Sequence, residues 1–327
     1  MYLRIVLTVT LTAIFTSFAF AQSNWSFLNP QPTGSTLRDV ISTDANTLWT
    51  IGDEGILLVS NDDGENWAAR ELPTNAHLFA ITFHARRGCI VGAEGTILVS
   101  DDFGESWQLR NFGTSKTLLR AEFIDENTGW VLAADSLLLQ TTDGGHSWQA
   151  DTLEHDFITG TFSLALNDLE FVSPNVGWLA VGYYRQPNLD INPESRGALL
   201  KTADGGKTWA IVDSGDTKFT SIHFLNHLTG WITTNNVDSG RAVLRTDDGG
   251  ETWTKHGVAF DWQKMYFHNS RHGWGTYYTY IGRTIDGGAT WSIDRYMDPP
   301  SPESGFKGLV FRNETDGWVV GFHTWHQ

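Results

Sequence analysis

Four carboxylates lie in segments that are expected to form the first strand of a repeated unit, and paired carboxylates are the groups that hydrolyse glycosides. They are Asp39, Glu122, Asp168 and Glu170. In such an enzyme one carboxyl group protonates the leaving oxygen, while the second acts as a base or a nucleophile. These side chains would have to meet across a central channel, so glycoside hydrolysis is kept as an alternative function.

Three pairs of histidines have the short spacing of metal ligands. They are His223 and His227, His268 and His272, and His323 and His326. The pairs fall at expected strand ends and turns, where this spacing does not place two imidazoles on one face, and no third ligand is nearby in sequence. We therefore predict no metal site. No cofactor is predicted either, because the Gly-Gly pairs lack the Lys-Ser/Thr that follows in a phosphate-binding loop.

The charge of the chain limits the classes of partner. The net charge is −16 and no basic run occurs, so there is no segment to neutralise phosphates, and we predict no nucleic-acid binding. Cys89 is the single cysteine, which excludes an internal disulfide, and its apolar surroundings predict a buried, unreactive thiol.

The first 21 residues have the features of a signal peptide. Arg4 precedes the apolar run 5–20, and Ala19-Phe20-Ala21 is a small-x-small cleavage site. No second long apolar stretch follows, so no transmembrane segment is expected after cleavage. We predict export to the periplasm or the extracellular space, and one domain over residues 22–327.

One phrase, Ser/Thr-x-Asp-x-Gly-x-x-Trp, occurs six times, and successive copies are 38 to 61 residues apart. Copies at a period of about 40–45 residues with four short strands per copy are typical of β-propellers. Its Asp can accept bonds from the turn, its Gly can adopt positive φ, and its Trp can be buried between sheets. These structural residues are Asp62, Gly64, Trp67, Asp102, Gly104, Trp107, Asp143, Gly145, Trp148, Asp204, Gly206, Trp209, Asp248, Gly250, Trp253, Asp286, Gly288 and Trp291.

A second series of aromatic residues predicts the number of blades. The expected second strands carry Trp49, Trp130, Trp178, Trp231, Trp274 and Trp318, with Ile90 at the equivalent place in the second unit. Seven residues before each, the first strand ends at Ser42, Phe83, Phe123, Phe171, Phe224, Phe267 and Phe311. Seven such pairs predict an all-β, seven-bladed propeller with four-stranded antiparallel blades, in which the N-terminal strand at 24–27 completes the last blade.

The repeated turn resembles the Asp-box, or BNR repeat, of sialidases, sortilin-type receptors and xyloglucan-cleaving glycosidases. The longer unit, with a Gly-Trp second strand and an Asp-Gly-Gly-x-Thr-Trp turn, most resembles the photosystem II stability/assembly factor family and its secreted bacterial relatives. That resemblance implies a non-catalytic propeller that binds other proteins. The chain departs from sialidases because it has no Arg-Ile-Pro phrase, and from xyloglucanases because it has room for only one propeller.

The face opposite the Asp-box turns is predicted to bind a protein partner. Its loops vary most in length, and Tyr, Trp and Arg are the residues most enriched in interface anchors. The candidates are Tyr183, Tyr184, Arg185, Trp262, Tyr277, Tyr278 and Tyr280, with Arg38 and Arg120 at the channel mouth. Aromatic residues also stack on sugars, so a carbohydrate ligand is the alternative.

Overall fold

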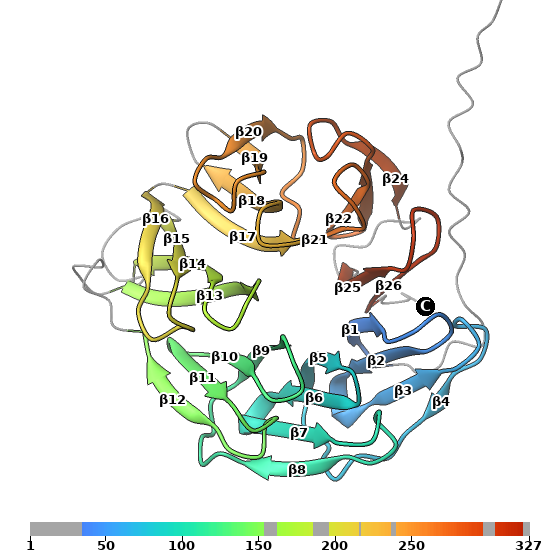
Figure 1. The fold of residues 1–327 in the computed structure, drawn as a ribbon. Coiled ribbons are helices and arrows are strands. Elements are labelled where there is room, and N and C mark those ends of the chain that lie inside the picture. The colour runs from blue at the N-terminus through green and yellow to red at the C-terminus, as the bar shows by residue number, and fades with distance from the viewer. Residues whose placement is uncertain are drawn as a thin grey trace, which may run out of the picture.

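The computed structural model is a ring of antiparallel β-sheets around a central axis (Figure 1). It describes residues 35–153, 162–185, 196–215, 217–236, 240–296 and 305–322. Within these ranges no helix is long and apolar enough to cross a lipid bilayer. The signal peptide predicted at 1–21 lies outside the described residues.

Six sheets contain four strands each, and in every one the strand order follows the sequence from the axis outward (Figure 1). We number these blades along the chain, and the strands within each blade from one, at the axis, to four. Blades 1 to 3 are β1 (Leu37–Ser42), β2 (Leu48–Gly52), β3 (Leu57–Ser60), β4 (Ala68–Ala69); β5 (Leu78–His84), β6 (Arg87–Gly92), β7 (Thr96–Ser100), β8 (Gln108–Asn111); and β9 (Leu118–Phe123), β10 (Gly129–Ala133), β11 (Leu137–Thr141), β12 (Gln149–Thr152). Blades 4 to 6 are β13 (Phe162–Phe171), β14 (Gly177–Arg185), β15 (Arg196–Thr202), β16 (Ala210–Gly215); β17 (Thr217–Phe224), β18 (Gly230–Asn236), β19 (Gly240–Thr246), β20 (Thr254–Gly257); and β21 (Lys264–Phe267), β22 (Gly273–Tyr277), β23 (Tyr280–Thr284), β24 (Ser292–Tyr296).

The prediction of seven four-stranded blades is wrong, because the described residues form six. Within the part of the chain that the structure describes, the last Phe–Trp pair, Phe311 and Trp318, belongs to a two-stranded sheet of β25 (Gly305–Phe311) and β26 (Gly317–Phe322). Strands three and four of a blade are joined by an Asp-box turn, so the six turns, rather than the seven Phe–Trp pairs, give the number of complete blades. The N-terminal strand that was predicted to complete the last blade, at 24–27, lies outside the described residues.

The β25–β26 sheet lies in the ring beside blade 1 (Figure 1). Gly308 approaches β1 so closely that an added Cβ would lie 2.8 Å from the Cα of Asp39. Arg312 forms an ion pair with Asp63 at 2.5 Å and also donates to the carbonyl of Ala45. These contacts join the last sheet to the first blade.

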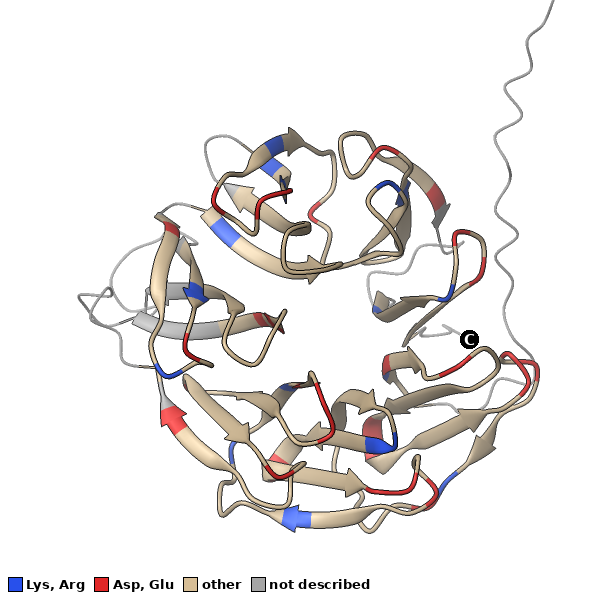
Figure 2. Ribbon diagram, viewed as in Figure 1, with Lys and Arg blue, Asp and Glu red and all other residues tan. Residues whose placement is uncertain are grey.

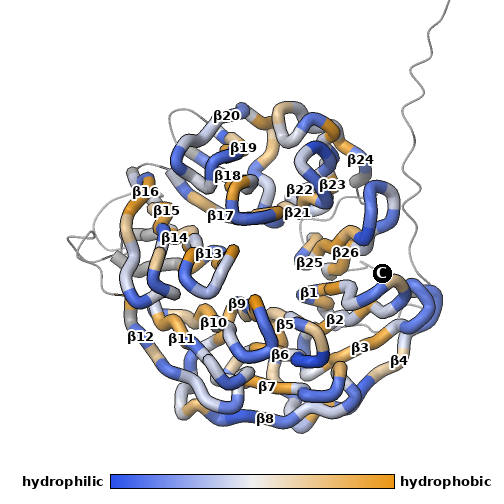
Figure 3. The backbone as a smooth tube through the Cα atoms, viewed as in Figure 1, coloured by the Kyte–Doolittle hydropathy of each residue, from blue (hydrophilic) through white to orange (hydrophobic). Residues whose placement is uncertain are grey.

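Three aromatic rings connect each of several blades to the next. The strand-two Trp of one blade contacts the Phe that ends strand one of the next blade, and this Phe meets its own Asp-box Trp edge to face. In blades 3 and 4, Trp130 stacks on Phe171 with ring centroids 3.5 Å apart, and Phe171 lies 6.1 Å from Trp209 at 75°. Such geometry stabilises the fold by about 0.5–1.5 kcal/mol per aromatic pair, beyond the effect of burying the rings. Figure 3 shows the hydrophobic stretches along the inner strands and the hydrophilic ones in the turns.

The strand register in blade 2 corrects the predicted place of Ile90 at the tryptophan position of strand two. Trp130 and Trp178 face Glu122 and Glu170, the residues just before the terminal Phe of strand one. In blade 2 the residue at that place is Thr82, and it faces Cys89. Cys89, rather than the predicted Ile90, therefore occupies the tryptophan position, where it is fully buried, and burial raises the pKa of its thiol to about 12.

Candidate functional site

The six Asp-box turns share one network of hydrogen bonds. In blade 4, Gly206 N–H donates to Thr202 Oγ1 at 2.9 Å, and the Thr202 hydroxyl donates to Asp204 Oδ1 at 2.9 Å. Asp204 also accepts from the main chain and hydroxyl of Thr208, and these bonds lower the pKa of Asp204 to about 2. The six motif glycines have φ between 81° and 93°. Because the Asp oxygens are occupied by the turn itself, the network favours a structural role for these residues.

Main-chain bonds fix which turns share a face. Each Asp-box turn donates an N–H to a carbonyl in the strand one–two turn of its own blade, as Gly205 does to Asn175 at 2.9 Å. The opposite face carries the strand two–three turns and the connections between blades, which are joined by bonds such as Phe306 N–H to the Tyr278 carbonyl at 2.8 Å. Figure 2 shows many of the acidic residues in the turns at the ends of the strands.

The four carboxylates considered above as catalytic groups connect neighbouring inner strands. Glu122 accepts from Phe171 N–H with both oxygens, at 3.0 and 2.9 Å. Glu170 accepts from Phe224 N–H through Oε1, at 2.8 Å. Asp39 accepts from Ile81 N–H at 3.2 Å, and Asp168 from Ile222 N–H at 3.0 Å. Each bond joins strand one of one blade to strand one of the next, which favours a structural role for these carboxylates over acid–base catalysis.

Titratable groups on the inner strands have strongly shifted pKa values. Burial, partly offset by the Phe171 N–H, raises the pKa of Glu122 to about 8, and burial together with the charge of Glu122 raises that of Glu170. Burial lowers the pKa of His223 to about 4, and the nearby Arg120 lowers that of Lys264. These groups occupy β9, β13, β17 and β21, so one side of the inner ring is the most electrostatically perturbed part of the described chain.

The predicted binding residues divide into four groups in the structure. Tyr277, Tyr278 and Tyr280 lie at the β22–β23 turn, on the face opposite the Asp-box turns. The main chain of 183–185 belongs to β14. The side chains of Tyr183, Tyr184 and Arg185 lie outside what the structure describes, so their role in binding stays a prediction.

Trp262 is fully buried, so it cannot contact a partner at the surface. It lies five residues before Phe267, as the buried Leu118 and Phe219 lie five residues before Phe123 and Phe224. Trp262 therefore takes the place of a core residue of strand one, and it packs against Gly275 and Gly282.

The two arginines are paired with acidic groups. Arg38 donates to Asp53 at 2.5 and 3.1 Å, and its guanidinium lies 4.9 Å from the centre of the Phe79 ring. Arg120 donates to Asp168 at 3.3 Å and to the carbonyl of Leu119 at 3.0 Å. Arg120 thus lies within the inner ring rather than on the outer part of the face.

Two residues that the sequence analysis missed complete an aromatic surface, which we call the aromatic patch and define as Phe260, Tyr277, Tyr278, Tyr280 and Arg241. The Phe260 ring lies 5.8 Å from Tyr277 and 5.4 Å from Tyr280, and Tyr277 lies 4.7 Å from Tyr278. The Arg241 guanidinium lies 5.9 Å from the centre of the Tyr277 ring. Tyr278 is 53% exposed. The patch is a cluster of interface-type side chains on the predicted face.

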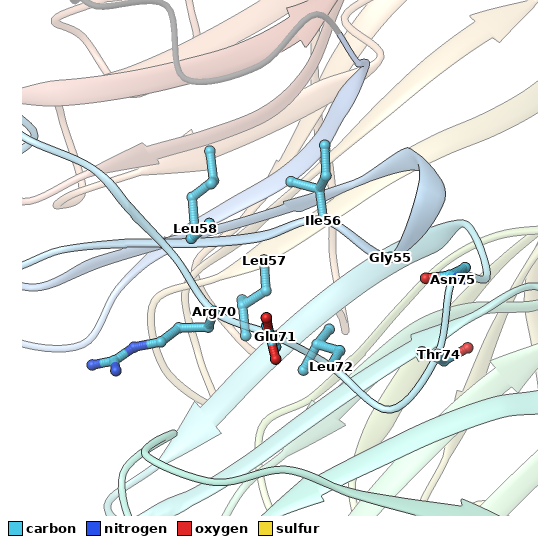
Figure 4. Close-up of a pocket in the computed structure, with 10 residues that line it drawn as sticks. Gly55, Ile56, Leu57, Leu58, Arg70, Glu71, Leu72, Thr74 and Asn75 are labelled. Atoms are coloured by element: carbon cyan, nitrogen blue, oxygen red, sulfur yellow. The ribbon is translucent and has the colours of Figure 1, made fainter.

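Two shallow hollows lie elsewhere on the ring. One, of about 340 Å³, is lined by Leu57 and Leu58 of β3 and by the connection that carries Arg70 and Leu72 (Figure 4). In Figure 4 the side chain of Arg70 points away from the other labelled residues. The second hollow, of about 550 Å³, lies between the connections that follow blades 1 and 2. In blade 1 the outer strand is only two residues long, and the connection that follows it lines the first hollow.

The fold and the six turns define this protein as an Asp-box β-propeller. The chain belongs to the family described as Photosynthesis system II assembly factor YCF48, whose model matches residues 17–111 and 105–189, together just over half of the 327 residues. No curated protein matches the sequence.

Solved structures match the fold at low identity. A YCF48 from Cyanidioschyzon merolae is 19% identical, with a TM-score of 0.66 over 90% of this chain and 95% of that one. A YCF48 bound to a D1 peptide is 16% identical, with a TM-score of 0.61 over 89% and 92% of the two chains. The GH74 enzyme of Niastella koreensis is 12% identical, with a TM-score of 0.52 over 84% of this chain and 60% of that one. At these identities the likeness concerns the fold alone.

Proposed function

We propose that this chain is an exported, non-catalytic propeller that binds a partner protein through the aromatic patch. The observation that carries the proposal is the convergence of four aromatic rings and an exposed arginine on the face opposite the Asp-box turns. Rigid aromatic rings supply a large contact area at a small cost in side-chain entropy, which is why Tyr, Trp and Arg dominate binding hot spots.

Family membership supports a protein partner. The family is described as an assembly factor, and one solved relative is bound to a D1 peptide. A peptide partner is consistent with a patch that combines ring faces with a cation. Export rests on the signal-peptide features of residues 1–21.

The backbone of Tyr278 is strained in a way that suits a binding site. Tyr278 has a φ of 47°, in the left-handed region that bulky residues avoid. It is the first of two residues in the hairpin turn between Tyr277 and Tyr280, which pair directly. Glycine would relieve this strain, so an exposed Tyr here costs about 1 kcal/mol that the fold does not need. Non-glycine residues also have positive φ in the strand two–three turns of blades 1 to 3, at Glu54, Glu94 and Asp135, but Tyr278 is the aromatic one among them.

Site-specific photocrosslinking tests the proposal. A photoreactive phenylalanine analogue placed at Tyr278 in the native host is expected to give a discrete protein adduct. The matched control is Ile285, which is equally exposed at 55% but lies in an Asp-box turn on the other face. The adduct should disappear in Tyr280→Ala and Arg241→Ala variants whose melting temperatures are unchanged. An adduct that forms equally at both positions, or that survives both substitutions, would contradict the proposed face.

The strain gives a second measurement. Tyr278→Gly should raise the free energy of unfolding by about 1 kcal/mol, because the turn keeps its shape without the penalty for positive φ. The same variant should lose the crosslinked partner when the analogue is placed at Tyr277. A stable variant with undiminished capture would show that the Tyr278 side chain is not part of the interface.

A further inference from the structure

The junction between blades 2 and 3 is built differently from the junctions that contain a strand-two tryptophan. Between blades 3 and 4, the Trp130 indole donates to the carbonyl of Gly205 in the next Asp-box turn, at 3.0 Å. In blade 2 this position is Cys89, whose short side chain is buried within its own junction. The side chain that contacts the Asp-box turn of blade 3 is instead Arg87, which packs so closely on Gly144 that an added Cβ would lie 2.5 Å from the guanidinium.

Two arginines converge on one histidine at this junction. Arg87 Nη1 lies 3.2 Å from His146 Nε2, and Arg110 Nη2 lies 3.1 Å from His146 Nδ1. Arginine can only donate, whereas neutral imidazole has one accepting nitrogen and imidazolium has none. At most one of the two contacts is therefore a hydrogen bond, and in the other an N–H faces an N–H. The cluster has more donors than acceptors.

The nearby acceptors are already engaged. Asp101 forms an ion pair with Arg87, and its other oxygen lies 3.6 Å from His146 Nε2. The Glu126 carboxylate lies 3.7 Å from Arg86 Nε, and the main-chain oxygen of Glu126 accepts from Arg87 Nε at 3.1 Å. Gln108 accepts from Arg110 at 2.7 Å.

Arg110 still lacks acceptors after these contacts, because its Nε is buried and has no hydrogen-bond partner. His146, by contrast, is open to solvent, since its side chain is 41% exposed.

We propose that Arg110 and His146, with Arg87 beneath them, form a binding site for an oxyanion, either a phosphate group or a carboxylate. The planar guanidinium fork of Arg110 matches the paired oxygens of both groups. An oxyanion here would accept from Arg110 and from a ring N–H of His146, and so would add an acceptor to a cluster that has more donors than acceptors. The site lies on the side of the Asp-box turns, away from the aromatic patch, and is independent of the partner proposed there.

Histidine NMR at constant ionic strength tests this site. Protein with isotope-labelled histidine, in a chloride buffer, is titrated with inorganic phosphate and, in a second arm, with acetate. We expect a saturable change in the His146 ring signals, which are assigned by their loss in His146→Gln. Saturation by phosphate alone identifies a phosphate site, and saturation by acetate, with or without phosphate, shows that the site accepts a carboxylate. Absence of saturation with either anion would overturn the proposal.

Two arginine variants separate a specific site from a general charge effect. Arg110→Gln is expected to weaken the apparent affinity about tenfold or more, as for the loss of a charge-assisted hydrogen bond. Arg245→Gln is the matched control, because Arg245 already forms two bonds of 2.9 Å with Asp247, next to the Asp-box turn of blade 5. The control should keep the wild-type response. Equal losses in the two variants, or full affinity in Arg110→Gln at an unchanged melting temperature, would refute the site.

Discussion

Replacement of Glu122 by glutamine should make the propeller more stable in alkaline solution. The carboxyl group of Glu122 bridges β9 to the main chain of Phe171, and its pKa is raised from 4.5 to about 8, mainly by burial. Because the pKa of Glu122 is higher in the folded than in the unfolded chain, the stability that its protonated carboxyl group contributes is fully present below about pH 4.5. It is lost as the pH rises through about 8, since the unfolded chain gives up its proton more readily.

The magnitude follows from the size of this rise. At 1.36 kcal/mol per pKa unit the full effect would approach about 5 kcal/mol. The Glu122 side chain is half-buried, so its remaining contact with solvent screens its charge, and we expect about 1–2 kcal/mol. Glutamine keeps the shape of the side chain and can still accept from Phe171, without a charge at any pH. It also removes the charge that raises the pKa of Glu170.

Urea unfolding followed by tryptophan fluorescence at pH 4.5, 6.5 and 8.5 measures the effect. Glu122→Gln should match the wild type at pH 4.5 and exceed it by about 1–2 kcal/mol at pH 8.5. Glu105→Gln is the control, because the Glu105 side chain is 69% exposed and should show no such trend. If the Glu122→Gln and wild-type stabilities keep the same difference at all three pH values, Glu122 is ionised in the folded protein and the reasoning fails.

Two substitutions in the Asp-box turns test their structural role. Thr202→Val should cost about 1–3 kcal/mol in urea unfolding, because it leaves the buried N–H of Gly206 without its acceptor; a cost below about 0.5 kcal/mol would show that water replaces the hydroxyl. Gly250→Ala should cost about 3 kcal/mol or more, since the added Cβ would lie 2.2 Å from the Trp178 ring at a φ of 81°. Gly240→Ala, at a φ of 74° with open space around it, should cost only about 1 kcal/mol, and similar losses at both glycines would rule out the indole contact as the cause.

The repeated parts of this fold can be predicted from the sequence, because six copies of one motif with the same spacing indicate the same local structure in each blade. The Asp-box turns recur with the same residues at the same spacing, and the structure gives them one bonding pattern, shown by Thr202, Asp204 and Gly206. The number of blades was misjudged because Phe311 and Trp318 have the pattern of strands one and two. That pattern does not require strands three and four.

The remaining differences depend on register and on contacts between blades. Cys89 and Ile90 are neighbours in an apolar strand, and only the pairing with Thr82 shows which one faces the next blade. Trp262 was misplaced although a signal was present, because its distance from Phe267 equals that of Phe219 from Phe224. The bond from Glu122 to Phe171 could not be predicted, since it depends on how one blade is offset against the next.

The aromatic contacts between blades have a direction, and this sets a condition on how such a ring can grow. Each complete junction takes an indole from the earlier unit and a phenylalanine from the later one, as Trp231 and Phe267 show with centroids 3.7 Å apart. An inserted copy supplies both an indole and a phenylalanine, so each of its neighbours still finds an aromatic partner. The pair is missing where the last sheet meets blade 1, because Ser42 stands where the phenylalanine would be, although Trp318 carries an arginine over its ring (Arg312, 5.2 Å) as Trp231 does (Arg245, 5.5 Å). Units can therefore be gained or lost in the interior by duplication or deletion, whereas the junction that closes the ring is held by other contacts, such as the ion pair of Arg312 with Asp63.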